Sequence, residues 1–188
     1  MRITLTILAA MSLAACGSET STTSETASTD PVVNTGDQMA AGDTSMPTDG
    51  AGYVAMAGAS DLFEIQSSEL AVEKSQNEEV RQFAQHMIEQ HRMTTEQVTS
   101  AAQAAGMTPA APQMNAMQQE MLSQLQAATG AEFDRTYLQQ QGQAHEMALS
   151  LHRNFGEQGD TQQLQQVANQ AVPIIEQHIS QLEGINAG

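Results

Sequence analysis

The sequence predicts an all-α protein, a bundle of four long helices with an extra short helix between the second and the third. Residues 53–188 of the 188-residue chain are rich in Gln, Ala, Glu, Met and Leu, which favour helices. The same residues contain no run of β-branched or aromatic side chains of the kind that forms strands. Glycine, proline and helix-capping residues are spaced widely enough for long helices with short connections, which is typical of a bundle.

Helix-breaking and helix-capping residues set the expected boundaries. Asn77 is a suitable N-cap for the second long helix, which ends where glycine and proline accumulate between Gly106 and Pro112. Gly130 marks a further break, and Asp160 is the expected N-cap of the last helix. The predicted long helices span about 54–75, 77–105, 131–156 and 161–184, and the predicted short helix spans about 113–127. Within the last helix, Pro173 is expected to cause a bend.

Residues 1–15 resemble a bacterial lipoprotein signal peptide. Arg2 precedes an apolar run that ends at Leu13 and is too short to predict a membrane span. The segment Leu13-Ala14-Ala15-Cys16 resembles a lipobox, whose cysteine receives several acyl chains that hold a protein stably at a membrane. The alternative is an ordinary signal peptide with a chance cysteine. No aspartate follows Cys16, and the resemblance therefore favours the outer membrane, facing the periplasm.

Residues 16–52 are expected to form a lipidated cysteine and a disordered tether, followed by the bundle domain over residues 53–188. The tether is composed mainly of Ser, Thr, Gly, Asp, Glu and Ala, which provide little to bury. The formal net charge is -16 with a pI near 4.3, and the six Lys and Arg residues exclude a nucleic-acid partner. Because charge would not draw the domain to an anionic surface, membrane contact is expected through the lipid at Cys16. Cys16 is the only cysteine, so no internal disulfide is possible.

One polar side chain in each long helix is expected to face the bundle core. Helical periodicity turns His91, His145 and His178 inward, and Glu64 lies in a seam of small residues. Three imidazoles and one carboxylate would suit one transition-metal ion, Zn, Fe, Mn or Cu. Glu64 and His91 lie at similar numbers of residues from the turn that joins their helices, so they are expected at the same height along the bundle. The same counts separate His145 and His178 by roughly 10 Å along the bundle.

A structural interpretation of these residues competes with the metal site. A single inward histidine is more often a hydrogen-bonded core residue than a ligand. Glu64 would be a capping partner of Asp61 if the first helix began late. The periodicity places His86 and Glu89 on the solvated face. His152 is expected at the flank, where an imidazolium would suit the end of its helix.

Two further groups of residues have both a functional and a structural interpretation. Asp134 and Tyr137 share a helical face and could orient a metal-binding histidine. We favour a structural interpretation, in which Asp134 is an acidic residue of the first helical turn and the ring of Tyr137 packs inward. Met114, Met117 and Met121 lie on one face of the short helix. Thioethers prefer soft ions such as Cu(I), yet we favour core packing, because the chain has four Phe, two Tyr and no Trp.

Three segments resemble a bacterial exported family, number 4142 of the domains of unknown function. They are LFEIQSSELAVEKSQNEEVRQFAQHMIEQHRM, GAEFDRTYLQQQGQAHEMAL and VANQAVPIIEQHI. The resemblance extends over about residues 53–181 and implies a ferritin-like bundle. The positions that match the family pattern are Glu64, His91, Asp134, Tyr137, His145 and His178. The family usually has an acidic residue before the histidine of the second helix, where this chain has Gln90.

These observations define three hypotheses from different functional classes. We favour a cell-envelope lipoprotein that binds a transition metal through buried His and Glu residues, for metal buffering or envelope stress. The alternatives are a metal-free envelope interaction protein and a metal-dependent oxidoreductase. The chain has no E-x-x-H motif, which argues against a ferritin-type di-iron oxidase, and no cofactor motif or nucleophile constellation supports an enzyme.

Overall fold

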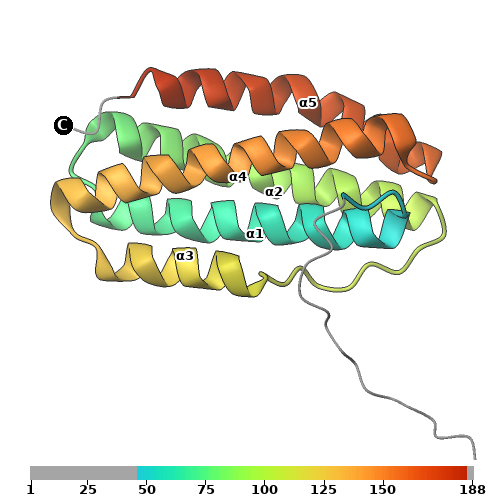
Figure 1. Ribbon diagram of the computed structural model, residues 1–188, viewed down its shortest axis with the longest axis horizontal. Coiled ribbons are helices and arrows are strands. Elements are labelled where there is room, and N and C mark those ends of the chain that lie inside the picture. The colour runs from blue at the N-terminus through green and yellow to red at the C-terminus, as the bar shows by residue number, and fades with distance from the viewer. Residues whose placement is uncertain (1–45, 186–188) are drawn as a thin grey trace, which may run out of the picture. The chain divides into compact units, whose positions relative to one another are not determined.

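The computed structural model describes residues 46–185, which form five helices and no strand (Figure 1). This confirms the predicted all-α bundle with a short helix between the second and third long helices. The predicted signal peptide, Cys16 and most of the predicted tether lie outside the described residues. Among the described residues, no helix is long and apolar enough to cross a membrane. The helices are α1 Gly50–Lys74, α2 Glu78–Ala104, α3 Ala116–Ala127, α4 Gly130–Gln158 and α5 Gln162–Glu183.

Capping side chains explain where three of these helices begin. Asp49 accepts a hydrogen bond from the Gly52 amide at 2.8 Å, so α1 begins four residues before its predicted start, and the predicted tether, which ended at residue 52, was too long. Asn77 caps α2 as predicted. Asn115 forms a capping box that delays α3 to residue 116, three residues after its predicted start. The prediction for Asp160 was wrong: Thr161 occupies the N-cap of α5.

The long helices pack as two antiparallel pairs, α1 with α2 and α4 with α5, which close the bundle through contacts of α1 with α4 and of α2 with α5. The short helix α3 lies outside this bundle, along α1 and α4 (Figure 1). Lys74 fixes the end of α3, because its Nζ donates to the carbonyls of Leu125 at 3.0 Å and Gln126 at 2.7 Å. Helix α5 is continuous through Pro173.

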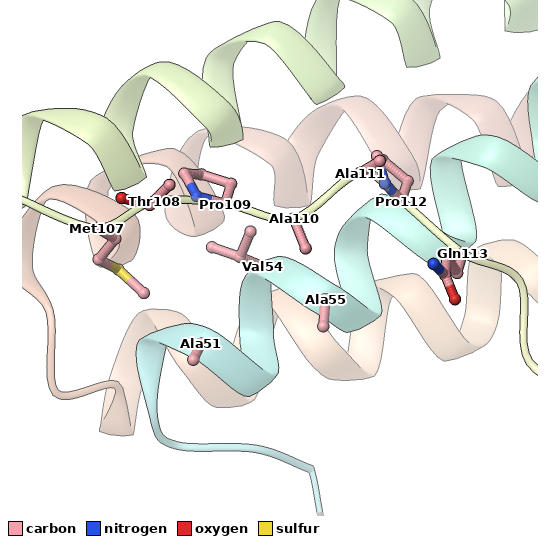
Figure 2. Close-up of a pocket in the computed structure, with 10 residues that line it drawn as sticks. All are labelled: Ala51, Val54, Ala55, Met107, Thr108, Pro109, Ala110, Ala111, Pro112 and Gln113. Carbon is pink, nitrogen blue, oxygen red and sulfur yellow. The ribbon is translucent and has the colours of Figure 1, made fainter.

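The connection between α2 and α3 runs beside α1 and encloses a cavity of about 600 Å³ (Figure 2). Alanines, prolines, Val54 and Met107 line most of this cavity. A Cβ atom on Gly58 would lie 3.2 Å from Cγ of Pro112, so the missing side chain lets the connection approach α1 closely. The connection therefore occupies one flank of the bundle and leaves the central core to the four long helices.

The core of the bundle is arranged in layers along the helices. One end layer is apolar and contains Tyr53, Val98, Leu151, Phe155 and Leu164. The opposite end layer is also apolar and contains Val80, Phe83, Met87, Phe133 and Tyr137. In each long helix a buried ionisable residue lies between the segments that supply these two layers: Glu64, His91, His145 and His178. The sequence order of every helix thus places a polar layer in the middle of the bundle.

Candidate metal centre

Three buried histidines from three helices converge in the polar layer. His91 lies on α2, His145 on α4 and His178 on α5, and each is at most 5 % exposed. One ring nitrogen of each histidine lies within 4.8 Å of the corresponding nitrogens of the other two. The inward positions follow from helical periodicity, since each histidine continues the apolar stripe of its helix.

The carboxylate of Glu64 completes the cluster from α1. Its Oε2 lies 2.7 Å from Nε2 of His91 and 3.4 Å from Nε2 of His145, and that nitrogen lies 3.3 Å from Nδ1 of His178. Two ligands bonded to one tetrahedral ion at about 2.1 Å lie about 3.4 Å apart. These three separations are close to this value, and the three histidines form a group whose nitrogens all lie within 4.8 Å of one another. Glu64 lies next to this group, against His91 and His145.

The predicted offset of roughly 10 Å between His145 and His178 was wrong. His145 lies 13 residues before Gln158, where α4 ends, and His178 lies 16 residues after Gln162, where α5 begins. The difference of three residues is about 5 Å of helix rise. Helix α4 ends at Gln158, two residues later than the predicted end at residue 156. The later end reduces the offset between the two histidines enough for their imidazoles to come into contact.

Hydrogen bonds on the outer nitrogens orient two of the imidazoles. His91 Nδ1 lies 2.9 Å from Oδ1 of Asp61, whose Oδ2 accepts from Thr95 Oγ1 at 2.8 Å. His145 Nδ1 lies 2.8 Å from the carbonyl oxygen of Gln141. Carboxylate and carbonyl oxygens accept, so both Nδ1 atoms carry hydrogen and both Nε2 atoms face the cluster. Metal-bound histidines commonly donate their other ring N–H to a carboxylate or carbonyl oxygen in this way.

Asp61 contacts the cluster, although the sequence predicted it only as a helix cap. The residue is 5 % exposed and lies three residues before Glu64, in the interior of helix α1, which begins at Gly50. Its spacing of three from Glu64 places both carboxylates on one helical face, which was the available signal. The interpretation of Glu64 as a capping partner of Asp61 is therefore wrong.

Opposite charges and burial shift the pKa values of the cluster in different directions. Burial lowers the pKa of His91, but Glu64 and Asp61 outweigh it and raise that pKa to about 10. Burial raises the pKa of Glu64, but His145 and His91 outweigh it and lower that pKa to about 2. Burial and the neighbouring histidines lower the pKa of His178 to about 3. Without a metal, His91 is therefore an imidazolium held between two carboxyl groups, while His178 is neutral.

The closest pair of the cluster is not aligned for a hydrogen bond. Glu64 Oε2 and His91 Nε2 are buried and 2.7 Å apart, yet neither atom has a hydrogen-bond partner of acceptable geometry. The contact is an ion pair of Glu64 with the His91 imidazolium, so a metal ion bonded to both atoms would have to replace the proton on His91. Three imidazoles with an adjacent carboxylate are nevertheless a donor set that fits a transition-metal ion.

A cavity of about 20 Å³ lies next to the cluster, between α1, α2, α4 and α5. Asp61, His91, His152 and His178 contribute to its wall. This volume holds about one water molecule. The cavity could therefore supply one water ligand to an ion held by the cluster.

The comparisons with known proteins agree with the family resemblance. The sequence model of one family, described as a domain of unknown function (DUF4142), matches residues 35–185, which is most of the chain. The chain belongs to this family. No curated protein shows a significant match to it.

Solved structures similar to this DUF4142 protein share its fold at low sequence identity. CopM in its Cu(I)-bound form has a TM-score of 0.62 and 18% identity, over 72% of this chain and 94% of CopM. CopM in its Cu(II)-bound form has a TM-score of 0.61 and 17% identity, over the same shares. A putative secreted DUF305 protein from Streptomyces coelicolor has a TM-score of 0.61 and 14% identity, over 74% of this chain and 94% of that protein. These similarities establish the bundle fold.

Two histidines of the DUF4142 domain differ from their predicted environments. His86 was expected to face solvent, but it is partly buried and its ring centroid lies 5.5 Å from that of His178, because α5 covers this side of α2. His152 was expected to be charged at the helix flank. It is 4 % exposed, its Nδ1 lies 3.0 Å from the Tyr53 hydroxyl, and burial lowers its pKa to about 4. Glu89 is exposed, as predicted.

Asp134 and Tyr137 lie outside the histidine cluster. The hydroxyl of Tyr137 lies 2.8 Å from Oγ of Ser68, and its ring packs in the apolar end layer with Phe133. This agrees with the structural interpretation that we favoured for the tyrosine. Asp134 is buried rather than a surface residue of the first turn, and its Oδ1 has no hydrogen-bond partner among the described residues. The contacts of Tyr137 include no hydrogen bond to His91, His145 or His178.

The methionines of the short helix divide between packing and exposure. Met114 and Met121 pack against the small cluster of Phe63, Leu122 and Ala144, as the packing interpretation predicted. Met117 is 51% exposed, so core packing does not apply to it. The three sulfur atoms do not form one buried group, since Met114 precedes the helix and Met117 faces away from the core.

Proposed function

We propose that this DUF4142 protein is an exported, lipid-anchored module that binds one transition-metal ion in the core of its bundle. His91, His145 and His178 would supply nitrogen ligands, and Glu64 would supply an oxygen ligand and negative charge. The observation that supports this most strongly is the convergence of three buried imidazoles, whose ring nitrogens lie within 4.8 Å of one another beside the Glu64 carboxylate. Asp61 and the Gln141 carbonyl would hold the ligand rings in place.

The donor set favours copper(II) among the divalent ions. Imidazole and carboxylate donors suit Zn, Fe, Mn and Cu, and in such sites affinity is highest for Cu(II) in the divalent series. The similarity of fold to CopM, which has been crystallised in Cu(II)-bound, Cu(I)-bound and Ag-bound forms, is in accord with this choice. Loading would require release of the proton that the Glu64 and Asp61 carboxyl groups hold on His91.

Buffering of the ion suits this site better than catalysis. All four proposed ligands are buried, and the adjoining cavity of about 20 Å³ admits about one water molecule. A metal-dependent oxidoreductase needs an open ligand position and a path for its substrate. The four residues would instead hold an ion away from solvent and release it slowly, which serves metal storage or protection of the envelope against metal stress.

Metal content measured by inductively coupled plasma mass spectrometry tests this proposal. The exported protein is purified from the envelope without a histidine tag, beside the H91A/H178A variant and the control variant H86A. We expect near-stoichiometric metal in the unsubstituted protein and in H86A. H91A/H178A should lose about 100-fold or more in affinity for Cu(II), because removal of two ligands should exceed the loss of about 10–100-fold seen when residues that orient ligands are removed. Equal metal binding by all three proteins would contradict the proposed site.

A metal-free role is the second candidate, and the ion pair of His91 with Asp61 and Glu64 favours it. Such a buried triad can exist without a metal when its charges are balanced. Reconstitution with Zn, Fe, Mn and Cu separates the two candidates. No bound metal after any of these treatments, together with a loss of stability in H91A/H178A, would indicate a structural histidine cluster in an envelope interaction protein.

The proposed anchor rests on the segment that resembles a lipobox and needs its own test. We expect the mature protein to begin at acylated Cys16 and to sediment with membranes, because several acyl chains give stable anchoring. The C16A variant should lose the lipid mass and move to the soluble periplasmic fraction. Mass spectrometry of the mature N-terminus would contradict the proposal if Cys16 carried no lipid in the unsubstituted protein.

A further inference from the structure

Methionine dominates the exposed apolar surface of the bundle. Among the described residues, the exposed large apolar side chains are Met56 at 42%, Met93 at 48%, Met117 at 51%, Met147 at 45% and Ile174 at 40%. Single exposed apolar side chains are ordinary and need no explanation. Several exposed apolar side chains around one cavity are less ordinary, because neighbouring apolar side chains usually pack together and become buried.

Two of these methionines line one cavity together with a third. Met46 precedes α1, Met56 lies on α1 and Met147 lies on α4, and all three contribute to the wall of a cavity of about 330 Å³. Gly52 and Ala55, with little or no side chain, leave room for the longer thioether chains. Met93 and Met117 are comparably exposed but do not line this cavity. The fold thus brings three methionines to the wall of one cavity from positions up to 101 residues apart in the sequence.

The chemistry of the wall points to a soft monovalent ion. Thioether sulfur is a neutral, polarizable donor that selects ions such as Cu(I) over harder divalent ions. Three rotatable bonds allow each methionine to turn its sulfur toward a common point. Among the described residues that line the cavity, none is acidic or basic, so the wall offers no charge to balance a divalent ion. We propose that Met46, Met56 and Met147 form a second metal site, which binds Cu(I) or Ag(I) through thioether sulfur.

This thioether site would be distinct from the histidine centre but next to it. Ser60 and Ala148 line both the methionine cavity and the small cavity beside the histidines. Ser60 Oγ also donates to Glu64 Oε1 at 3.2 Å. The proposal does not require metal at the histidine centre. If both sites bind metal, an ion captured by the methionines lies one side chain away from the buried ligands.

Titration with Ag(I), in chloride-free buffer, tests the thioether site without a change of oxidation state. Every sample carries the substitution C16S in the full chain, so that no thiol competes. The test variant is M56L/M147L, because leucine conserves volume and apolar character but lacks sulfur. The matched control is M93L/M117L, which removes two methionines of similar exposure outside the cavity. We expect M56L/M147L to weaken Ag(I) binding by about 10-fold or more, and the control to bind as the unsubstituted chain does.

The H91A/H178A background separates this site from the histidine centre. Binding of Ag(I) that persists in this background and disappears when M56L/M147L is added supports the proposal. Binding lost with the histidines alone overturns it, since the silver would then belong to the histidine centre. Methionine methyl resonances, observed by ¹³C NMR, give a second measurement: those of Met46, Met56 and Met147 should shift at the first equivalent. Equal shifts of Met93 and Met117 would show unspecific surface binding and would also overturn the proposal.

Discussion

The end layers and the middle layer of this bundle differ in what they contribute. At one end, Tyr53 and Phe155 stack with ring centroids 4.1 Å apart, and both are 0% exposed. In the middle, Glu64 and His145 are equally inaccessible, yet Glu64 Oε2 lacks an aligned hydrogen bond. Apolar burial stabilises a fold by roughly 1.5–3 kcal/mol for each large side chain, whereas buried polar groups with incomplete partners cost energy. The comparison indicates that the apolar ends provide most of the stability of the bundle, and that the polar middle layer provides less.

The largest effect on stability is expected in the apolar end layer. Phe155→Ala should lower the free energy of unfolding by about 3–5 kcal/mol, because it removes a buried ring and leaves a cavity. The variant should still bind one metal ion while folded, since the end layer contains no proposed ligand. Urea denaturation of the metal-free protein, followed by circular dichroism, measures the change. A loss below about 1 kcal/mol would contradict the role that we assign to this layer.

His152 lies between the two layers and should make the bundle sensitive to acid. Its pKa is lowered to about 4 in the folded state, against about 6.5 for an ordinary histidine. Above pH 6.5, His152 is neutral in both the folded and the unfolded protein. As the pH falls from 6.5 to 4, only the unfolded state takes up the proton, so stability decreases by up to about 3 kcal/mol. Denaturation of the metal-free protein and of His152→Gln at pH 7.5 and 4.5 isolates this contribution. Equal pH dependence in both proteins would refute it.

Asp61 should affect the metal more than it affects the fold. Asp61→Asn keeps the volume but replaces the carboxyl group that holds His91 Nδ1 with a weaker acceptor, so affinity for Cu(II) should fall about 10–100-fold. The control is Glu69→Gln, which neutralises an exposed carboxyl group on the same helix. Competition with a chelator of known affinity measures both variants. An effect of Glu69→Gln equal to that of Asp61→Asn would indicate general electrostatics rather than orientation of His91.

The smallest effect is expected for the exposed ion pair of Arg92 with Glu69. Its atoms lie 3.0 Å apart, and the two side chains are 60% and 51% exposed. Exposed pairs contribute about 0–1 kcal/mol and are screened by salt. Arg92→Ala should therefore change the free energy of unfolding by less than about 1 kcal/mol at 0.15 M salt. A larger loss, unaffected by added salt, would show that this surface pair is coupled to the core.

The sequence by itself determined the helices and the inward direction of most site residues. Composition, caps such as Asn77 and the spacing of apolar residues are local properties, and the phase of a helix advances about 100° per residue whatever surrounds it. This is why Glu64, His91, His145 and His178 could be selected before the structure. It is also why the boundary errors stayed small, such as the start of α1 at Gly50 after the Asp49 cap.

Only the tertiary structure decided which of these residues meet. The height of His178 relative to His145 depends on where the α4–α5 connection lies and how the helices pack, and neither is a local property. Hydrogen-bond partners of Asp61 and His152 lie 30 and 99 residues away in the chain, and Met147 lies 91 residues after Met56 on the wall of the same cavity. The tertiary environment then sets the protonation of each histidine. His91 lies between two carboxyl groups and is charged, whereas burial keeps His152 neutral.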